Sequence, residues 1–168
     1  MKDRENTIEY REIKISEIDR RLFSGFIRHQ KVVKCRRKSG GRWVIADDPF
    51  TDDWSEPDYE KLILSLKENS ARGGLVFGAF ADDVLKGFIS VRLGLFGGDR
   101  KYIDLSEIHV SEELRRTGIG KVLFERAKDW AKQNGADYLY ISAHSSVESQ
   151  AFTPKWAAQT PCIRTKPT

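Results

Sequence analysis

The stretch Arg115-Arg-Thr-Gly-Ile-Gly120 lies between a segment with the pattern of a β-strand and a segment with the pattern of an α-helix. Lys101–Val110 before it has apolar residues at 103, 105, 108 and 110, and Lys121–Asn134 after it is helix-like and ends at Gly135. The first N–H groups of a helix lack intrahelical partners, and together with the helix dipole they suit an anion. The two glycines let a ligand approach the backbone closely. The stretch therefore predicts a phosphate-binding turn.

Two common phosphate loops do not fit this stretch. A Walker loop needs Gly-Lys followed by Ser or Thr, but Gly120-Lys121 is followed by Val122. The dinucleotide fingerprint needs a third glycine, which is missing here. An ordinary strand-to-helix connection with a solvated Arg115-Arg116 pair remains the simpler alternative.

The turn and its surroundings resemble the Arg/Gln-x-x-Gly-x-Gly/Ala signature of the GNAT superfamily of N-acetyltransferases. Leu105-x-x-Ile108-x-Val110 precedes the turn, an amphipathic helix follows it, and the strand-like Ala136–Ala143 comes next. Ser146-x-x-Ser149-x-x-Phe152 then stands where the family has Asn-x-x-Ala-x-x-Phe-Tyr. The resemblance covers residues 75–152.

The resemblance implies that acetyl-coenzyme A is the cosubstrate and that the turn cradles its pyrophosphate. The backbone of the preceding strand would hold the thioester and stabilise the oxyanion, and the Thr117 hydroxyl could also donate to the pyrophosphate. The residues expected to bind the cofactor are Ile108, His109, Val110, Arg115, Arg116, Thr117, Gly118, Ile119, Gly120, Lys121, Ser146, Ser149 and Phe152.

The general base in this family is often a carboxylate on the strand before the turn, and Glu107 matches that position. Asp104 is a weaker candidate, while His109 and His144 qualify through the ordinary pKa of imidazole. For each of these, a solvated or salt-bridged residue is the alternative. Strand alternation predicts Leu105, Glu107 and His109 on one face, with residues 106, 108 and 110 on the other. Glu107 and His109 are the predicted catalytic residues.

The pattern along the chain is of the α/β (α+β) class, with the order β-α-α-β-β-β-α-β. This matches the GNAT fold, in which helices flank a mixed, mostly antiparallel sheet. We expect strands at Thr7–Ile15, with a bulge or an early end, and at 75–80, 86–93, 101–110 and 136–143, and helices at Asp58–Ser70 and Lys121–Asn134. Trp130 is expected in the core of the last helix rather than at a ligand.

The resemblance also implies that the first two helices and their connection provide the contacts to the acceptor. Ser16 suggests the cap of a helix from Ile18 to His29. Val32-Val33 fits either a helical turn or a strand, and Thr51–Pro57 reads as a turn in which Asp52-Asp53 cap the next helix. The candidate acceptor contacts are Arg28, His29, Gln30, Trp43, Asp52, Asp53 and Trp54.

The chain departs from the family pattern after Phe152. Thr153 stands where the family commonly has a tyrosine that protonates the leaving thiolate, and residues 153–168 do not read as the two strands that complete the sheet. Read one nucleotide earlier, the codons permit Phe-Tyr-Pro-Lys-Met-Gly-Cys and then Ala-Asp-Ala-Leu-Tyr-Lys-Asp-Glu-Ala-Tyr. We therefore expect one GNAT domain at residues 1–152 and a tail at 153–168 that is frameshifted, with the C-terminal strands missing or altered. The exposed strand edge predicts self-association, as a homodimer or a larger assembly.

Charge and composition narrow the class of protein. The 29 basic and 25 acidic residues give a formal net charge of +4, but without the last sixteen residues the net charge is +1, so a nucleic-acid partner is not expected. No apolar stretch reaches the length of a membrane span, and the charged N-terminus is unlike a signal peptide. Cys35 and Cys162 suggest neither a metal site nor a disulfide framework, which favours the cytoplasm. The sequence predicts an N-acetyltransferase for a small-molecule or peptide amine, or alternatively an acyl-coenzyme A-binding protein with little turnover.

Overall fold

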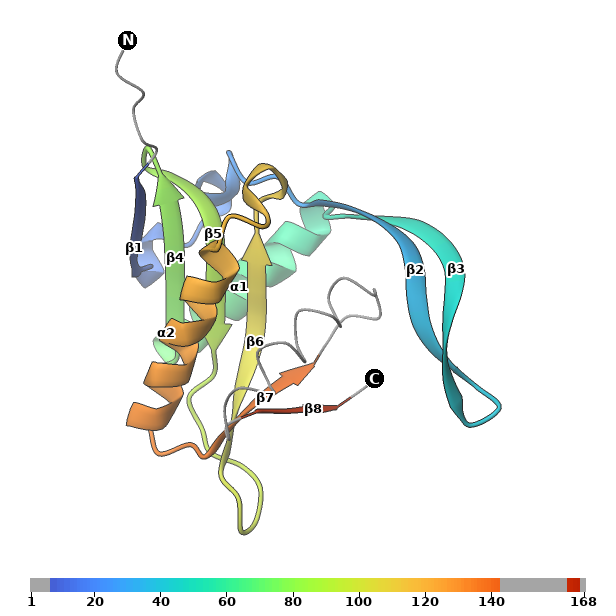
Figure 1. Cartoon of the computed structure of the whole chain (residues 1–168). Coiled ribbons are helices and arrows are strands. Elements are labelled where there is room, and N and C mark those ends of the chain that lie inside the picture. Colours follow the sequence, from blue (N-terminus) through green and yellow to red (C-terminus); the bar gives the residue numbers. More distant parts are fainter. Residues whose placement is uncertain (1–6, 143–162, 167–168) are drawn as a thin grey trace.

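The computed structural model describes residues 7–142 and 163–166, which form a six-stranded sheet with the order β1-β4-β5-β6-β7-β8 (Figure 1). Its strands are β1 (Ile8–Glu12), β4 (Leu75–Ala81), β5 (Val84–Val91), β6 (Tyr102–Val110), β7 (Tyr138–Ser142) and β8 (Ile163–Lys166). Neighbours from β1 to β6 pair antiparallel, whereas β6 with β7 and β7 with β8 pair parallel. The expected mixed sheet is confirmed. Of the two alternatives for the first strand, a bulge or an early end, the structure shows the early end, because β1 stops at Glu12.

Two helices cover the opposite faces of this sheet (Figure 1). α1 (Glu56–Ala71) contributes Leu62 and Leu66 to a buried cluster with Phe88 of β5, here called the α1 core. α2 (Ile119–Gln133) buries Leu123 with Ile89 in a second cluster, the α2 core. Neighbouring residues of a strand point to opposite faces, so β5 serves both cores. Trp130 packs against the α2 core, as expected.

α1 begins at a capping box just before the expected helix. The backbone N–H and the hydroxyl of Ser55 donate to the Asp58 carboxylate at 2.8 and 2.6 Å. A cap of this kind contributes about 1 kcal/mol, because it satisfies helix-end groups that would otherwise lack a partner. The expectation that Asp52-Asp53 cap this helix is wrong, since both residues lie in a strand and Ser55 makes the cap.

The expected helix from Ile18 to His29 is also wrong. Two short 3₁₀ helices, η1 (Ile15–Glu17) and η2 (Arg20–Phe23), take its place. Ser16 lies inside η1, and the Asp19 carboxylate caps η2 by accepting the Leu22 N–H at 3.1 Å. At the end of the segment, the Ile27 N–H and carbonyl bond to Ser111 and Glu112 rather than to groups within a helix. The apolar residues of this segment reach the α1 core from short turns instead.

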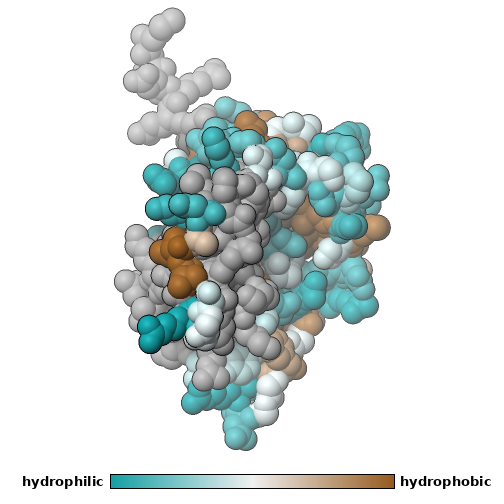
Figure 2. Space-filling model, turned by 90° about the vertical axis from the view of Figure 1, so that its right-hand side faces the viewer, coloured by the Kyte–Doolittle hydropathy of each residue, from teal (hydrophilic) through white to brown (hydrophobic). Residues whose placement is uncertain are grey.

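β2 (His29–Ser39) and β3 (Arg42–Asp53) form a separate two-stranded antiparallel sheet around the Gly40-Gly41 turn. This β2–β3 ribbon projects away from the six-stranded sheet (Figure 1). Val32-Val33 lie in strand rather than helix, and residues 51–53 belong to β3 rather than to a turn. Ile45 is 57% exposed, and Figure 2, which views the ribbon side, shows hydrophobic residues interspersed among hydrophilic ones.

The tail contributes one short strand to the sheet. β8 pairs with Leu139–Ser142 of β7, and this four-residue strand agrees with the expectation that the C-terminal strands are altered. The rest of the tail lies outside the described residues. No helix in the described part of the chain has the length and apolarity to cross a membrane.

Candidate active site

A β-bulge in β6 determines which side chains face the candidate site. Ser90 of β5 pairs with Glu107 and Val91 pairs with Leu105, so Ser106 is the extra residue. A bulge shifts the alternation of the strand by one position. Leu105 is therefore buried in the α2 core, and Ile108 also packs there, whereas Glu107 turns to the α1 side. The expectation that Leu105 shares a face with Glu107 and His109 is wrong for this reason.

Glu107 and His109 form a hydrogen-bonded pair on the α1 side of β6. The His109 Nε2 lies 2.7 Å from a carboxylate oxygen of Glu107, and both side chains are partly exposed. The His109 ring packs against Trp54, with ring centroids 4.7 Å apart, and against Phe88 at 5.3 Å. When His109 is neutral and protonated at Nε2, its Nδ1 can accept a proton. The two candidate bases thus act as one hydrogen-bonded unit.

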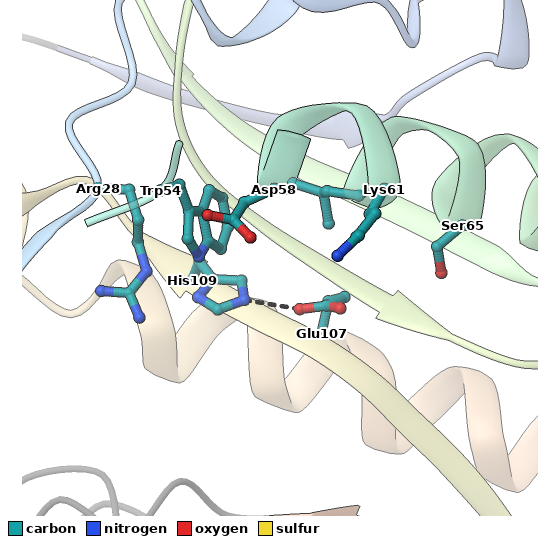
Figure 3. Close-up of a pocket in the computed structure, with 8 residues that line it drawn as sticks. Arg28, Trp54, Asp58, Lys61, Ser65, Glu107 and His109 are labelled. Atoms are coloured by element: carbon teal, nitrogen blue, oxygen red, sulfur yellow. Dashed lines mark hydrogen bonds and ion pairs between the residues drawn. The ribbon is translucent and has the colours of Figure 1, made fainter. Parts of the chain in front are cut away.

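The pair lies in a cleft of about 440 Å³ between β6 and α1 (Figure 3). The cleft is lined by Arg28, Trp54, Asp58, Lys61, Leu62, Ser65, Glu107 and His109. Of the candidate acceptor contacts, Arg28 and Trp54 reach this cleft, and the Arg28 guanidinium lies 5.2 Å from the centre of the Trp54 ring. His29, Gln30, Trp43, Asp52 and Asp53 belong to the β2–β3 ribbon.

Three cleft residues were not expected from the sequence: Asp58, Lys61 and Ser65 of α1. Their spacing of i, i+3 and i+7 places them on one face of the helix. A helix face that packs only against the core would be apolar at these positions. The polar residues at this spacing, next to the buried Leu62, therefore indicate that part of this face lines a cleft.

Asp104, the weaker base candidate, does not line the cleft. Burial raises the pKa of Asp104, and Arg92, with its guanidinium 3.5 Å from the carboxylate, partly offsets this effect. His144, Ser146, Ser149 and Phe152 lie outside the described residues.

The predicted phosphate-binding turn follows directly from the end of β6. After η3 (Glu112–Leu114), Arg116 and Gly118 have positive φ angles of 66° and 95°, and α2 begins at Ile119. Left-handed residues in a turn can direct neighbouring backbone N–H groups into a concave array that suits an anion. A Cβ added at Gly118 would meet nothing within 4 Å, so the turn has open space in front of its backbone. This geometry fits a pyrophosphate.

The two arginines of the turn differ in their surroundings. Arg115 is partly buried, and its Nε donates to the Val110 carbonyl at 3.2 Å, so this side chain braces the end of β6. Arg116 is exposed. The Thr117 hydroxyl donates to the Leu114 carbonyl at 2.6 Å, and in this arrangement it shapes the turn. The alternative of a solvated Arg115-Arg116 pair therefore does not hold for Arg115, whose side chain is held by the protein.

Hydrogen bonds connect the end of β6 with the segment that carries Arg28 into the cleft. The buried Ser111 hydroxyl accepts the Ile27 N–H at 2.8 Å, and the Ile27 carbonyl accepts the Glu112 N–H at 3.0 Å. The Lys86 ammonium donates to the Gly25 carbonyl and to Glu113 at 2.9 and 2.6 Å. No pattern in the sequence predicts this connection, since its partners lie about sixty to eighty residues apart.

Comparisons with solved structures support the fold. A protein of Bacillus anthracis str. Ames, assigned as a streptothricin acetyltransferase and solved with acetyl coenzyme A, is 20% identical with a TM-score of 0.66; the match covers 89% of this chain and 82% of that one. Nourseothricin acetyltransferase is 22% identical with a TM-score of 0.62, over 90% and 81% of the two chains. Glucosamine-6-phosphate N-acetyltransferase from Arabidopsis thaliana is 14% identical with a TM-score of 0.54, over 96% and 98%. At these identities the likeness concerns the fold alone.

The sequence itself identifies the family. No curated protein sequence gives a significant match. The model of the acetyltransferase (GNAT) family, however, matches residues 42–155, which include the cleft strand β6, the phosphate-binding turn and α2. Because this match spans more than half of the chain, the protein belongs to the GNAT family of acetyltransferases.

Proposed function

We propose that this chain transfers an acetyl group from acetyl-coenzyme A to a primary amine of a small molecule or peptide, by direct attack of the amine on the thioester. One observation carries the proposal. The end of β6 has the Glu107–His109 cleft on its α1 side and continues into the anion-binding turn before α2. A cofactor held at the turn can therefore present its acetyl group beside the cleft.

The cofactor side of the proposal rests on the backbone of the turn. The first N–H groups of α2, at Ile119 to Lys121, and the open face at Gly118 would receive the pyrophosphate. The backbone of Ile108–Val110 would hold the thioester. The relative from Bacillus anthracis, solved with acetyl coenzyme A, supports this assignment. Ser146, Ser149 and Phe152 remain further candidates from the sequence.

The acceptor side rests on the pair in the cleft. The amine must lose a proton to attack, and Glu107, directly or through water, or His109 through Nδ1 would take it. The C–N bond forms as the C–S bond of the thioester breaks, and the coenzyme A thiolate leaves and takes up a proton. Since Thr153 stands where the family commonly has a tyrosine, we propose that water supplies this proton.

A second candidate function follows from the same residue. With Thr153 in place of the tyrosine, the chain could bind acyl-coenzyme A with little turnover. We also propose that residues 153–168 arise from a shifted reading frame, which the end of the family match at residue 155 supports. Sequencing the coding DNA tests this idea, because codons incompatible with Phe-Tyr-Pro-Lys-Met-Gly-Cys would exclude it. A chain carrying the alternative tail should show a higher kcat with unchanged affinity for acetyl-coenzyme A.

Two measurements test the proposed function. Calorimetric titration with acetyl-coenzyme A reports binding, and release of free thiol in the presence of a panel of primary amines reports transfer. Binding together with amine-dependent thiol release supports the enzyme. Binding without release for any amine favours the second candidate. No binding of acetyl-coenzyme A would contradict both.

A further inference from the structure

The α1 wall of the cleft presents a cation opposite the catalytic pair. Lys61 lines the cleft and its side chain points from α1 toward the strand that carries Glu107 (Figure 3). Ser65 follows one turn later on the same helix face and also lines the cleft. The proposed transfer reaction uses neither side chain. An ammonium with a hydroxyl one turn away is a suitable pair of donors for an anionic group.

The carboxylates of the cleft already have partners within the protein. Asp58 accepts two hydrogen bonds from Ser55, and these bonds lower the pKa of Asp58 more than the attraction of Lys61 does. Glu107 is bonded to His109. Among the described residues, Lys61 forms no ion pair with Asp58 or Glu107, so its ammonium is available to an anionic group of a ligand.

The charge balance of the cleft indicates which acceptors fit. The cleft is lined by two cations, Arg28 and Lys61, and by two carboxylates, Asp58 and Glu107. A site for a polycation would need an excess of carboxylates, because unpaired like charges repel and lose hydration on binding. A balanced cleft instead suits a molecule that carries both an amine and an anion.

We propose that the acceptor carries a carboxylate or phosphate group on the same small molecule as its amine, and that Lys61 and Ser65 bind this anion while the amine lies beside Glu107 and His109. The proposal rests on the proposed function and narrows its substrate class. Lys61 is then a specificity-determining residue. The apolar side of the acceptor would pack against Trp54 and Leu62.

Matched acceptors isolate the anion. L-lysine and cadaverine differ by a carboxylate, and glucosamine 6-phosphate and glucosamine differ by a phosphate. The native chain should show a higher kcat/KM for the anionic member of at least one pair, and the pair that responds identifies the anion. Lys61→Met should lower kcat/KM for that anionic member about 10- to 100-fold, the loss typical of a charge-assisted hydrogen bond, and should leave kcat/KM for its counterpart without the anion nearly unchanged. Lys61→Arg should keep part of the preference.

Lys67→Met is the matched control, because Lys67 is exposed on α1 and does not line the cleft. This variant should change kcat/KM for neither member of a pair. An equal loss of kcat/KM for the acceptors with and without the anion in Lys61→Met would overturn the proposal, because Lys61 would then act on Glu107 alone. A preference of the native chain for the members without the anion in both pairs would overturn it as well.

Direct binding separates this proposal from the proposed function. Should the native chain acetylate no amine, calorimetric titration of L-lysine and glucosamine 6-phosphate in the presence of coenzyme A still tests the site. Binding to the native chain and its loss in Lys61→Met would support the anion site while the transfer activity fails. No binding of either ligand to the native chain would overturn the anion site.

Discussion

The hydroxyl of Ser111 accepts the backbone N–H of Ile27 at 2.8 Å, although 84 positions separate the two residues. This bond joins the end of β6, beside the proposed pyrophosphate turn, to the segment that carries Arg28 into the acceptor cleft. The Ser111 side chain is buried, whereas Ile27 is partly exposed. Together with the bond from the Glu112 N–H to the Ile27 carbonyl and the bonds of Lys86 to Gly25 and Glu113, this contact holds the two halves of the proposed site relative to each other.

Ser111→Ala should weaken acceptor binding more than cofactor binding. Removing the hydroxyl takes away this hydrogen bond of the Ile27 N–H and costs about 1 kcal/mol, which corresponds to a loss of roughly 2–4 °C in Tm for a chain of this size. We expect a higher KM for the acceptor and an unchanged Kd for acetyl-coenzyme A, measured by steady-state kinetics and calorimetry. Ser24→Ala, an exposed serine of the same segment, is the control. Equal losses in both affinities would argue against a positioning role.

Glu107→Gln should remove proton transfer and keep the shape of the cleft. A positioned base contributes about 10²- to 10⁴-fold, so kcat should fall by a factor in this range while calorimetry gives the native Kd for acetyl-coenzyme A. The double variant with His109→Gln should be no slower than the slower single variant, because the two side chains act as one unit. Glu112→Gln, at an exposed position of η3, should be neutral. A native kcat in Glu107→Gln would exclude Glu107 as the base.

Gly118→Asp and Gly118→Asn separate charge from backbone strain. Gly118 has a φ of 95°, which strains both new residues to a similar degree, and both have open space for their side chains. Aspartate adds a negative charge where the pyrophosphate is expected to bind. Affinity for acetyl-coenzyme A should therefore fall much further in the aspartate variant, and the difference should shrink at high salt. Identical affinities in the two variants would refute the assignment of the turn.

Glu113 should stabilise the fold near neutral pH and lose this effect in acid. Burial alone would raise the pKa of Glu113, but hydrogen bonds from Lys86 and Ser111 outweigh burial and lower it below 4.5. A lowered folded pKa stabilises the protein above the unfolded pKa, and the stabilisation is lost as pH falls through the folded value. Because the side chain is partly exposed, Glu113→Gln should lower Tm at pH 7 by only about 2–4 °C. The Tm values of the two chains should converge as pH falls through the lowered pKa of Glu113, and a constant difference at all pH values would contradict the assignment.

The sequence predicts self-association through the strand edge that the missing C-terminal strands would expose, and the β2–β3 ribbon offers a second surface on which self-association can be tested. A two-stranded ribbon is marginally stable alone, and its free edges and the exposed Ile45 suit a second copy of the chain. Light scattering should give the mass of a dimer for the native chain and a lower mass for Ile45→Lys. Leu64→Lys, at an exposed leucine of α1, should keep the native mass. Monomer at all concentrations would contradict the expectation.

The sequence predicted the half of the fold in which periodicity and turn residues agree. α1, β4, β5, β6, α2 and β7 lie where expected, because their apolar residues face a core at the spacing of their own element. Residues 18–29 have apolar residues at helical spacing too, yet they form 3₁₀ turns. There the Asp19 cap and the hydrogen bonds of Ile27 to Ser111 and Glu112 hold the backbone outside a helix, and the latter bonds join residues far apart in the sequence.

The sequence predicts the strand and the turn of the candidate site, but not the residues of α1 that line the cleft. Glu107 and His109 do lie together, although Leu105 does not share their face, because a bulge depends on pairing with β5 rather than on β6 alone. Lys61 and Ser65 became site residues only once α1 lay opposite β6.

The β2–β3 ribbon leaves and rejoins the domain at one place, where His29 Nδ1 and Asp53 Oδ1 lie 2.6 Å apart. The residues just outside this junction, Arg28 and Trp54, both line the cleft. The ribbon is thus an excursion of the chain that could be shortened, lengthened or exchanged without cutting a strand of the main sheet. Protein engineering could therefore exchange the ribbon beside the proposed acceptor cleft and alter the choice of acceptor. The β6 strand and the turn proposed to bind the cofactor would stay unchanged.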